Sequence, residues 1–561
     1  MTTLAKILLD HFEGHPEQIA IHLQSAGSDD LPVSYKKLIE RASAYADFYA
    51  NRGIQPGEVV ILILEHGEPL IYSFYGAILH GAIPSIMPFL TEKLSPERYR
   101  ADLASLISVT KPAAVLTYPE FEAEVRAAIG TESLIRSILL TSEVGEPGFV
   151  DSARLSGLAS SPDSITLLQH SSGTTGLQKG VALSHTAVLN QLYAYRNAIQ
   201  LTSQDVLVSW LPLYHDMGLI AGFIMPILEG IPLVLMSPFD WVRSPQRLLQ
   251  AVSKYKGTLS WLPNFAYNFC AQKIRDRHLE GVDLSSWRAI INCSEPVRYE
   301  SHVQFHEKFK TYGLKFEALQ TSYAMAENVF GVTQSDLFKG PALDEIDRER
   351  FLHEHIAQPV SDGRAVMKMM SSGKPISNTK VRILDEKEND VSERQIGEIA
   401  LSSNSMLTEY YHRPDATSKA FRDGWYLTGD YGYIANGELY VTGRKKDMII
   451  VGGKNVYPQD IESLVGQVTG IHAGRVVAFG LFDEAQGTEE VVVIAETDAQ
   501  NPDEIKNISD AVRAHVTKNS AVALRWIYLV GPKWLLKTSS GKIARSANKE
   551  KYLKETGRQA S

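Results

Sequence analysis

The sequence predicts an α/β protein with a large N-terminal domain of layered α/β subdomains, a small β-barrel-like subdomain, and a small α+β domain at the C-terminus. The first observation is an alternation of apolar runs with longer helix-like segments over most of the chain. Val/Ile/Leu-rich runs of this kind are typical of largely parallel strands that helices cover. The runs occupy residues 59–64, 113–118, 205–213, 231–236 and 314–323.

The second observation is a change of pattern after about residue 376. Residues 380–401 and 436–443 contain short strand-like runs joined by polar turns, which favours antiparallel strands. This is the segment expected to form the β-barrel-like subdomain.

The third observation is a compact α+β pattern that begins at Pro458. A helix-like run is followed by two strand-like runs, 473–482 and 489–497, and by a helix-like run near 503–518. Charge and glycine cluster just before it, in residues 443–455. We therefore expect one domain of residues 1–445 and a second of residues 446–561.

The composition excludes several classes of protein. The chain has 561 residues, of which 44% are hydrophobic and 22% charged, so it is neither disordered nor fibrous. A formal net charge of −9 argues against a nucleic-acid partner. Cys270 and Cys293 cannot form a disulfide framework, and reduced thiols indicate a cytoplasmic protein. The histidines form no metal-ligand motif, so no structural zinc is expected.

No membrane segment is expected. Residues 1–22 lack the basic and apolar regions of a signal peptide, and residues 4–12 have the apolar spacing of an amphipathic helix. Residues 218–236 are apolar enough to be considered as a span, but Pro226, Gly230 and Pro232 interrupt them. Because a span needs about 20 continuous apolar residues, a buried helix followed by a core strand is the better interpretation.

A loop rich in glycine and hydroxyl groups lies in residues 167–185, between a strand-like run and a helix-like run. Glycine lets backbone N–H groups approach an anion, and Lys179 adds positive charge, which predicts a phosphate-binding loop. It is not a Walker loop, because Gln178 stands where that motif needs glycine. A flexible Ser/Gly turn is the alternative. The expected phosphate-binding residues are Ser171, Ser172, Gly173, Thr174, Thr175, Gly176 and Lys179.

This loop resembles the signature of the adenylate-forming superfamily, which includes acyl-CoA synthetases, luciferases and adenylation domains. Four further motifs follow in the family's order, so the resemblance covers nearly the whole chain. They are Tyr323–Glu327 (YAMAE), Tyr426–Asp430 (YLTGD), Gly443–Asp447 (GRKKD) and Thr538–Arg545 (TSSGKIAR). Within the superfamily, residues 210–220, 262–270, 292–297 and 443–462 look most like fatty acyl-AMP ligases.

The resemblance implies ATP-dependent conversion of a fatty acid to an acyl-adenylate, with Mg²⁺ as a cofactor. Lys542 is the expected catalytic lysine, since its ammonium can reach both the carboxylate and the α-phosphate. Thr174 and Glu327 are expected to hold Mg²⁺ and so to be catalytic as well. A helix-capping role for Glu327 and an exposed tail position for Lys542 are the alternatives.

The remaining nucleotide contacts are also carried over by resemblance. Tyr323 would lie against adenine, and Asp430 would bind the ribose hydroxyls with Arg444 nearby; Asp430 could equally be a turn former. The other residues expected beside the nucleotide are Ser294, Glu295, Pro296, Ala324, Met325 and Ala326. Ala324 stands where the family usually has glycine, and Cys293–Ser294 replace the usual Gly-Ala.

The acyl chain would lie along an apolar wall. Neighbouring residues on a strand point to opposite faces, so the sequence argues against a His215–Asp216 dyad. His215 is instead expected to border the acyl pocket, with a hydrogen-bonded core histidine as the alternative. The residues expected to line the pocket are His215, Met217, Pro263, Asn264, Phe265, Ala266 and Tyr267.

The acceptor is expected to be the phosphopantetheine thiol of an acyl carrier protein, with CoA as the alternative. Residues 328–372 form a longer connection than CoA-forming relatives usually have, and 342–356 have helix character. In acyl-AMP ligases an insertion here is associated with weak or absent CoA transfer; a neutral surface insertion is the alternative. Lys446 occupies the family hinge about which the small domain would rotate. Residues 531–561 carry eight basic side chains, either steering an acidic carrier or forming a solvated face.

A non-catalytic acyl-adenylate sensor on the same fold is the third hypothesis. The presence of Lys542, Asp430, Arg444 and Glu327 argues against it.

Overall fold

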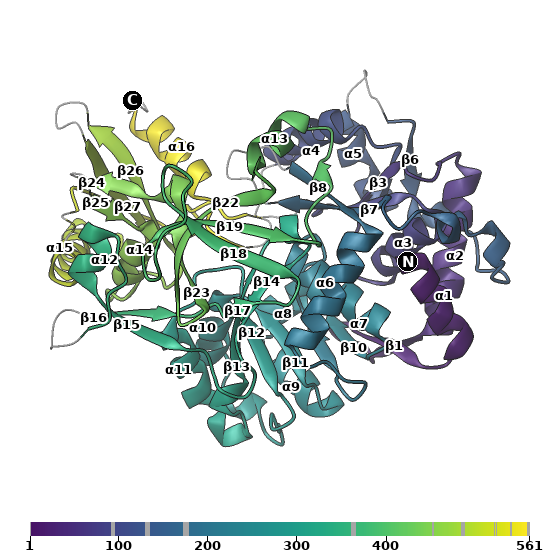
Figure 1. Ribbon diagram of the computed structural model, residues 1–561, viewed down its shortest axis with the longest axis horizontal. Helices are drawn as coiled ribbons and strands as arrows, with labels where there is room; N and C mark the ends of the chain where they lie inside the picture. Colours follow the sequence, from purple (N-terminus) through teal and green to yellow (C-terminus); the bar gives the residue numbers. More distant parts are fainter. Residues whose placement is uncertain are drawn as a thin grey trace.

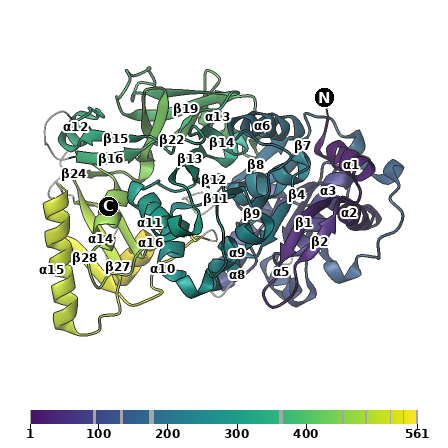
Figure 2. The same ribbon diagram turned by 90° about the horizontal axis from the view of Figure 1, so that it is seen from below.

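A computed structural model describes residues 2–90, 96–129, 135–171, 179–360, 366–451, 454–483, 488–520, 522, 524–538 and 541–557. The strands of the first three hundred residues belong to two large sheets, and helices pack against these sheets (Figure 1). The C-terminal elements lie on the side of the molecule away from the N-terminal helices (Figures 1 and 2).

The first sheet has nine strands and a mainly parallel centre. Antiparallel pairs occur only toward its two edges among the described residues. In spatial order the strands are β17 (Lys374–Pro375), β14 (Gly331–Gln334), β13 (Leu319–Ala324), β12 (Ala289–Asn292), β11 (Leu259–Leu262), β9 (Leu207–Ser209), β10 (Leu233–Met236), β1 (Ile19–Gln24) and β2 (Leu31–Ser34).

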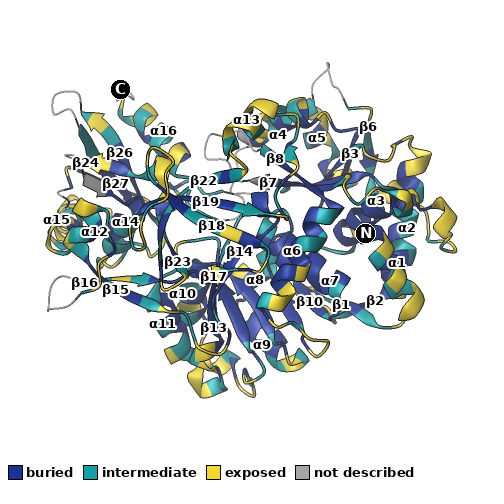
Figure 3. Cartoon of the chain, viewed as in Figure 1, coloured by how far each residue is buried: buried dark blue, intermediate teal, exposed yellow. Residues whose placement is uncertain are grey.

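The second sheet has seven strands, parallel except at β8. Its order is β20 (Glu409–Tyr410), β8 (Lys179–Ser184), β7 (Ile165–Ser171), β4 (Ile83–Ile86), β3 (Val59–Ile63), β5 (Ala114–Thr117) and β6 (Ser137–Leu140). Each apolar run that was predicted to be a strand overlaps a strand of the structure. The strands of both sheets are largely buried (Figure 3), as expected where helices cover both faces.

Helices cover the two sheets. They are α1 (Leu4–Gly14), α2 (Tyr35–Asn51), α3 (Glu68–His80), α4 (Pro96–Thr110), α5 (Glu122–Ile129), α6 (His185–Ala198), α8 (Pro238–Arg243), α9 (Gln246–Tyr255), α10 (Asn264–Lys273) and α11 (Tyr299–Phe309). Residues 4–12 belong to α1, whose buried face confirms the predicted amphipathic helix. α3 is buried from Leu70 to His80 and shares one hydrophobic core with residues of both sheets.

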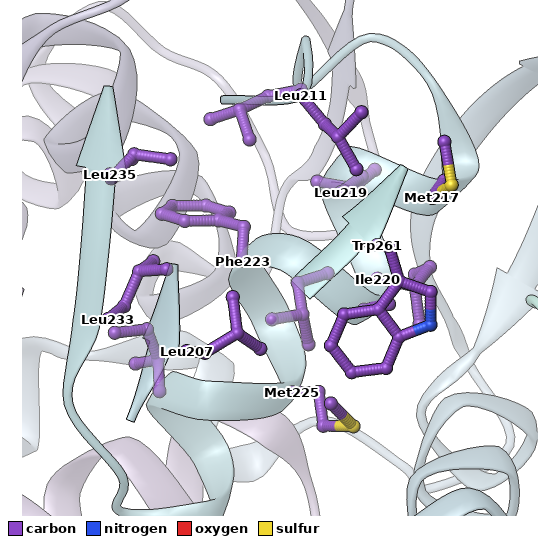
Figure 4. Close-up of a cluster of buried hydrophobic side chains, with 14 of the residues drawn as sticks. Leu207, Leu211, Met217, Leu219, Ile220, Phe223, Met225, Leu233, Leu235 and Trp261 are labelled. Atoms are coloured by element: carbon purple, nitrogen blue, oxygen red, sulfur yellow. The ribbon is translucent and has the colours of Figure 1, made fainter. Parts of the chain in front are cut away.

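Residues 218–236 form a buried helix and a core strand, as predicted. A π-helical segment, Met217–Ile224, continues into α7 (Met225–Glu229), and Gly230 ends the helix at a φ of 73°. Phe223 and Leu219 point among side chains of β9, β10 and β11 (Figure 4). No helix in the described part of the chain is long and apolar enough to cross a membrane.

The β-rich segment after residue 376 is a five-stranded antiparallel sheet. Its strands are β18 (Thr379–Leu384), β19 (Gly397–Ser403), β21 (Phe421–Arg422), β22 (Trp425–Ala435) and β23 (Glu438–Arg444), with α13 (Pro414–Ala420) before β21. β22 and β23 form a hairpin whose register places Asp430 opposite Arg444.

The helix predicted in residues 342–356 is only partly correct. Its first half is a strand, β15 (Leu343–Asp347), which pairs with β16 (Val366–Met370), and only α12 (Arg348–Glu354) is helical. The strand forms because Ile346 enters a buried cluster while its neighbour Glu345 stays exposed, which is the period of a strand.

The C-terminal elements follow the predicted order. They are β24 (Ile449–Val451), β25 (Lys454–Val456), α14 (Pro458–Gly466), β26 (Val476–Asp483), β27 (Thr488–Glu496), α15 (Pro502–Asn519), β28 (Trp526–Val530) and α16 (Arg545–Thr556). Two buried hydrophobic clusters pack on the two faces of the β26–β27–β28 sheet, and all their members lie between residues 449 and 553.

Candidate active site

Lys542 lies beside carboxylates that come from distant parts of the chain. Its turn is held by Thr538, whose N–H donates to Lys542 O at 2.7 Å and whose Oγ1 accepts from Lys542 N at 3.2 Å. The side chain is half-buried, and the negative charges of Glu295 and Asp216 act on its ammonium group. The exposed tail position, considered for this lysine from the sequence, does not apply.

Burial and charge act in opposite directions on this group. Burial lowers the pKa of Lys542, and the carboxylates of Glu295 and Asp216 partly restore it. Burial likewise raises the pKa of Glu295, whose carboxylate accepts from Phe265 N–H at 2.9 Å. No carboxylate in the described ranges lies within salt-bridge distance of the Lys542 ammonium. The result is a half-buried cation with charged neighbours but no ion-pair partner among the described residues.

The argument against a His215–Asp216 pair is wrong. The two residues do not lie on a strand: they follow β9 in a turn, and Asp216 caps the next helix by accepting from Met217 N–H at 2.7 Å. In that turn the two side chains approach each other, and His215 Nδ1 lies 2.6 Å from Asp216 Oδ1. Burial raises the pKa of Asp216, but His215 and Lys542 outweigh it, so this pKa is lowered overall.

A second group joins three of the predicted nucleotide residues. Tyr323 on β13 donates its hydroxyl to Asp430 Oδ2 on β22 at 2.6 Å, and Arg444 Nε lies 3.5 Å from Asp430 Oδ1. Burial raises the pKa of Asp430, which Arg444 opposes. Asp430 therefore lies within a strand and is not a turn former. Lys446, two residues beyond Arg444, has its pKa lowered by burial.

A third group surrounds Glu327, which lies in a short 3₁₀ turn, Ala326–Asn328. Its Oε1 accepts from the Tyr410 hydroxyl at 2.9 Å, and that hydroxyl lies 2.8 Å from the hydroxyl of Tyr426. Lys179 Nζ lies 4.5 Å from the centre of the Tyr410 ring. Burial raises the pKa of Glu327. Because Tyr410 binds this carboxylate from another element, Glu327 does not act as a helix cap.

The phosphate loop joins β7 to β8, so a strand and not a helix follows it. The sequence analysis missed β8, which is short and leads directly into α6. Antiparallel pairing of β7 with β8 places Ser171 opposite Lys179, the two described residues on either side of the predicted loop. Ser172, Gly173, Thr174, Thr175 and Gly176 lie outside the described residues, as does the side chain of Ser171.

The chemistry of Glu327 fits Mg²⁺. Mg²⁺ takes oxygen ligands and is usually bound through one or two carboxylates together with substrate phosphates. One buried carboxylate beside a hairpin with a basic residue at its base meets that description. No group of three or more His, Cys, Asp or Glu in the described ranges could hold a metal by itself, so phosphates would have to complete the shell.

The predicted acyl residues lie next to this site. Met217 Sδ is 3.0 Å from Cys293 Sγ, one residue before Ser294, and Ser294 has a φ of 68°. Phe265 contacts the stacked rings of Trp210 and Trp241 edge-on, with centroids 6.2 Å away. This places a wall of apolar and aromatic side chains behind the Glu295 carboxylate.

Two of the predicted acyl residues are also tied into the core. Asn264 accepts from Arg298 N–H and from Asn292 Nδ2, at 3.1 and 3.0 Å. Tyr267 is fully buried and donates its hydroxyl to Ile290 O at 3.0 Å. Pro263 and Ala266 are buried and Pro296 is exposed.

Sequence reasoning missed two groups at this site. Tyr410 has no motif of its own, and only pairing of β20 with β8 brings it to Glu327. The sequence argument against Asp216 assumed that His215 and Asp216 are neighbours on a strand. The signal that could have identified a turn there is Pro212, because proline is rare inside a central strand.

Comparison with known proteins gives a consistent picture. A family model described as AMP-binding enzyme matches residues 8–411. The medium-chain-fatty-acid–(acyl-carrier-protein) ligase JamA of Moorena producens is 30% identical, covering 95% of this chain and 92% of that protein. The probable long-chain-fatty-acid–AMP ligase FadD30 of Mycobacterium tuberculosis is also 30% identical, covering 93% of this chain and 92% of that protein.

Solved structures agree with these relatives. One from a study of fatty acyl-adenylate ligases from E. coli and L. pneumophila has a TM-score of 0.91 at 28% identity, covering 100% of this chain and 99% of that one. A fatty acyl-adenylate ligase from L. pneumophila in complex with acyl adenylate and pyrophosphate has a TM-score of 0.74 at 28% identity, covering 98% and 96%.

Proposed function

The chain belongs to the AMP-binding enzyme family, and from this premise we propose that it is a fatty acyl-AMP ligase that loads an acyl carrier protein. The observation that carries the proposal is Lys542, a half-buried cation that faces Glu295 and Asp216 and has no ion-pair partner in the part of the chain that the structure describes. A cation held in this way is suited to an anionic reactant. Relatives that ligate fatty acids to AMP or to a carrier protein support the substrate class.

In the first half-reaction a fatty-acid carboxylate attacks the α-phosphorus of ATP. A new oxygen–phosphorus bond forms as the bond to the β-phosphate oxygen breaks, and pyrophosphate leaves. Two anions must meet, so positioning and charge neutralisation provide the catalysis. Lys542 would contact both the carboxylate and the α-phosphate, while the loop at 171–176 and Lys179 would hold the other phosphates. When bound, Mg²⁺ at Glu327 and Thr174 would add positive charge at the phosphate oxygens.

The nucleoside would lie against Tyr323 and the segment 324–326, across from residues 294–296. Asp430 would accept from the ribose hydroxyls, with Arg444 donating nearby. In this structure the Tyr323 hydroxyl already donates to Asp430, so ribose would compete for or share that acceptor. The acyl chain would run from His215 along Met217 and Phe265, with Pro263, Asn264, Ala266 and Tyr267 behind them. Each buried methylene would contribute about 0.8 kcal/mol.

In the second half-reaction the carrier's thiol gives up its proton and its sulfur attacks the acyl carbonyl. A thioester forms and AMP leaves. We propose that residues 446–561 act as a mobile domain that turns about Lys446, relative to a body of residues 1–445. One contact such a movement would break is the Arg298–Asp460 ion pair, whose atoms are 3.1 Å apart.

The insertion favours a carrier protein over CoA as the acceptor. α12 reaches the C-terminal elements (Figure 1), and Phe351 packs against Tyr457 in a buried cluster. Asp344 anchors the insertion by accepting from Arg394 and from the Tyr433 hydroxyl, at 2.8 and 2.9 Å. The insertion therefore connects the body of residues 1–445 with the small domain, and the resemblance to fatty acyl-AMP ligases associates an insertion here with weak or absent CoA transfer.

Of the basic residues near the C-terminus, several have internal partners. Arg545 binds Asp447 and Glu462, Lys549 donates to Gly480 O, and Lys551 donates to Trp534 O. Lys554 is exposed. Steering of an acidic carrier would therefore fall to Lys554 and Lys533, the exposed lysines among the described residues of 531–557, and not to the whole basic set.

The experiment that tests the function supplies ATP and a panel of fatty acids, with either CoA or a phosphopantetheinylated carrier protein. Mass spectrometry then follows pyrophosphate, acyl-AMP and both thioesters. We expect acyl-AMP with every active acid and thioester only with the carrier. Acyl-CoA as the main product would instead show an acyl-CoA ligase. Absence of pyrophosphate release with all the acids would contradict both.

A further inference from the structure

A strained turn lies directly behind Glu327. Val329 has φ 62° and ψ −54°, and the N–H of Phe330 donates to Asn328 O at 2.6 Å, which makes a γ-turn with positive φ. This turn is rare, and a β-branched residue pays the largest steric cost in it. Such strain persists only where the surroundings hold it, and it clusters at functional sites.

The side chain of Gln169 holds one end of this turn. Gln169 lies on β7, two residues before Ser171 and the phosphate loop, and is buried. Its Nε2 donates to Val329 O at 3.2 Å. This bond ties the strand that leads into the phosphate loop directly to the turn that carries Glu327.

The side chain of Asn328 holds the other end. Its Nδ2 donates to Gly331 O at 2.7 Å, and this hydrogen bond spans the turn. Its Oδ1 accepts from the Ser403 hydroxyl on β19. Asn328 and Val329 are both fully buried. The backbone is fixed as well, since Met325 N–H donates to Phe330 O at 2.8 Å and closes the turn.

We propose that Gln169 and Asn328 are positioning residues that hold Glu327 through the γ-turn at Val329 and set its distance from the phosphate loop. The proposal rests on the proposed function, because it gives the Glu327 carboxylate the task of holding the metal of a metal–ATP complex. A cation shared by Glu327 and substrate phosphates needs both at a fixed separation. Gln169 is the described side chain that bonds the two segments directly.

The test compares two Gln→Leu variants of the full-length protein. Gln169→Leu removes the donor to Val329 O at nearly constant volume. Gln320→Leu is the matched control: Gln320 is equally buried, but it bonds Glu317 O and the Ser335 hydroxyl, away from the turn. Mn²⁺ binding in the presence of a non-hydrolysable ATP analogue is measured by electron paramagnetic resonance, and Mg²⁺ dependence by pyrophosphate release.

We expect Gln169→Leu to weaken Mn²⁺ binding by about tenfold, the lower end of the loss that follows removal of an outer-shell partner at a metal site. Raised Mg²⁺ should recover much of its rate, whereas Gln320→Leu should match the wild type in both measurements. Equal Mn²⁺ affinity in all three proteins overturns the proposal, and so does an equal loss in both variants, which would indicate general loosening of the core.

If Gln169→Leu does not fold, as judged by circular dichroism, Ser403→Ala decides. It removes the donor to Asn328 Oδ1 from a half-buried position. An unchanged Mn²⁺ affinity would then overturn the proposal, and a weaker one would support it. The metal measurement needs no fatty acid and no turnover. A wild type that binds Mn²⁺ with the analogue but activates no acid would therefore refute the proposed function and leave this inference open to the same test.

Discussion

Lys542 and Arg545 are buried cations three residues apart, yet their surroundings differ completely. Arg545 Nη1 lies 2.7 Å from Asp447 Oδ2, Nη2 lies 2.8 Å from Glu462 Oε1, and Nε donates to Ala478 O at 2.9 Å. Lys542 has no such partner among the described carboxylates and only faces Glu295 and Asp216 at longer range. Burial lowers the pKa of both groups, but only Arg545 has ion pairs strong enough to raise it overall.

The difference distinguishes Arg545, a cation that stabilises the fold, from Lys542, a cation proposed to bind a substrate anion. A buried charge costs several kcal/mol unless it is paired and hydrogen-bonded, which is the state of Arg545. The planar guanidinium satisfies its donors with fixed partners inside the small C-terminal unit. Under the proposed function, the donors of Lys542 would bind an anion that arrives from outside, and part of the cost of burying the lysine would be offset only when that ligand binds.

The largest expected effect follows from removing Lys542. Lys542→Ala should reduce acyl-AMP formation by about 10³-fold, since preorganised charge at a reacting phosphate is commonly worth that much. Its thermal stability should be unchanged or slightly higher, because the variant no longer buries an unpaired cation. Pyrophosphate release and calorimetry measure the two effects, with exposed Lys518→Ala as the control. Retention of most adenylation would contradict the assignment of this lysine.

Removing Arg545 should lower stability more than activity, which is the opposite of what is expected for Lys542. Arg545→Met leaves Asp447 and Glu462 buried without their cation, and breaking a buried pair in this way costs about 3–5 kcal/mol. Chemical denaturation should therefore show a destabilised C-terminal unit, while acyl-AMP formation at low temperature falls less than in Lys542→Ala. If Arg545→Met were fully stable but inactive, the distinction between the two cations would fail.

Part of the C-terminal fold around these two cations could be predicted from the sequence. Local patterns predicted α14, α15, β26 and β27, because the two helices each bury one face at helical spacing and the two strands are continuous apolar runs. The motifs indicated Lys542 and Asp430 as candidate site residues, because each lies in a short run of residues that resembles a family motif.

What could not be predicted depends on contacts between distant segments. Tyr410 reaches Glu327 only through pairing of β20 with β8, and Asp216 shares a side with His215 only because residues 210–216 turn. The strain at Val329 has no sequence signal either, since a valine is the residue least expected at a positive φ. Tertiary contacts impose all three, and a pattern of neighbours along the chain does not contain them.

The smallest expected effect concerns the pH dependence of catalysis. Lys542 must be protonated to neutralise the reacting anions, so kcat/KM should fall as the pH rises through the pKa of Lys542, which burial places below that of an ordinary lysine. Glu295 and Asp216 raise this pKa through their charge. Glu295→Gln keeps an acceptor for Phe265 N–H but removes one charge, so the pKa of Lys542 should fall further. The alkaline limb of the kcat/KM profile should therefore move to lower pH. Exposed Glu300→Gln serves as the control, and a limb that stayed in place or moved to higher pH would show that Glu295 does not act on Lys542.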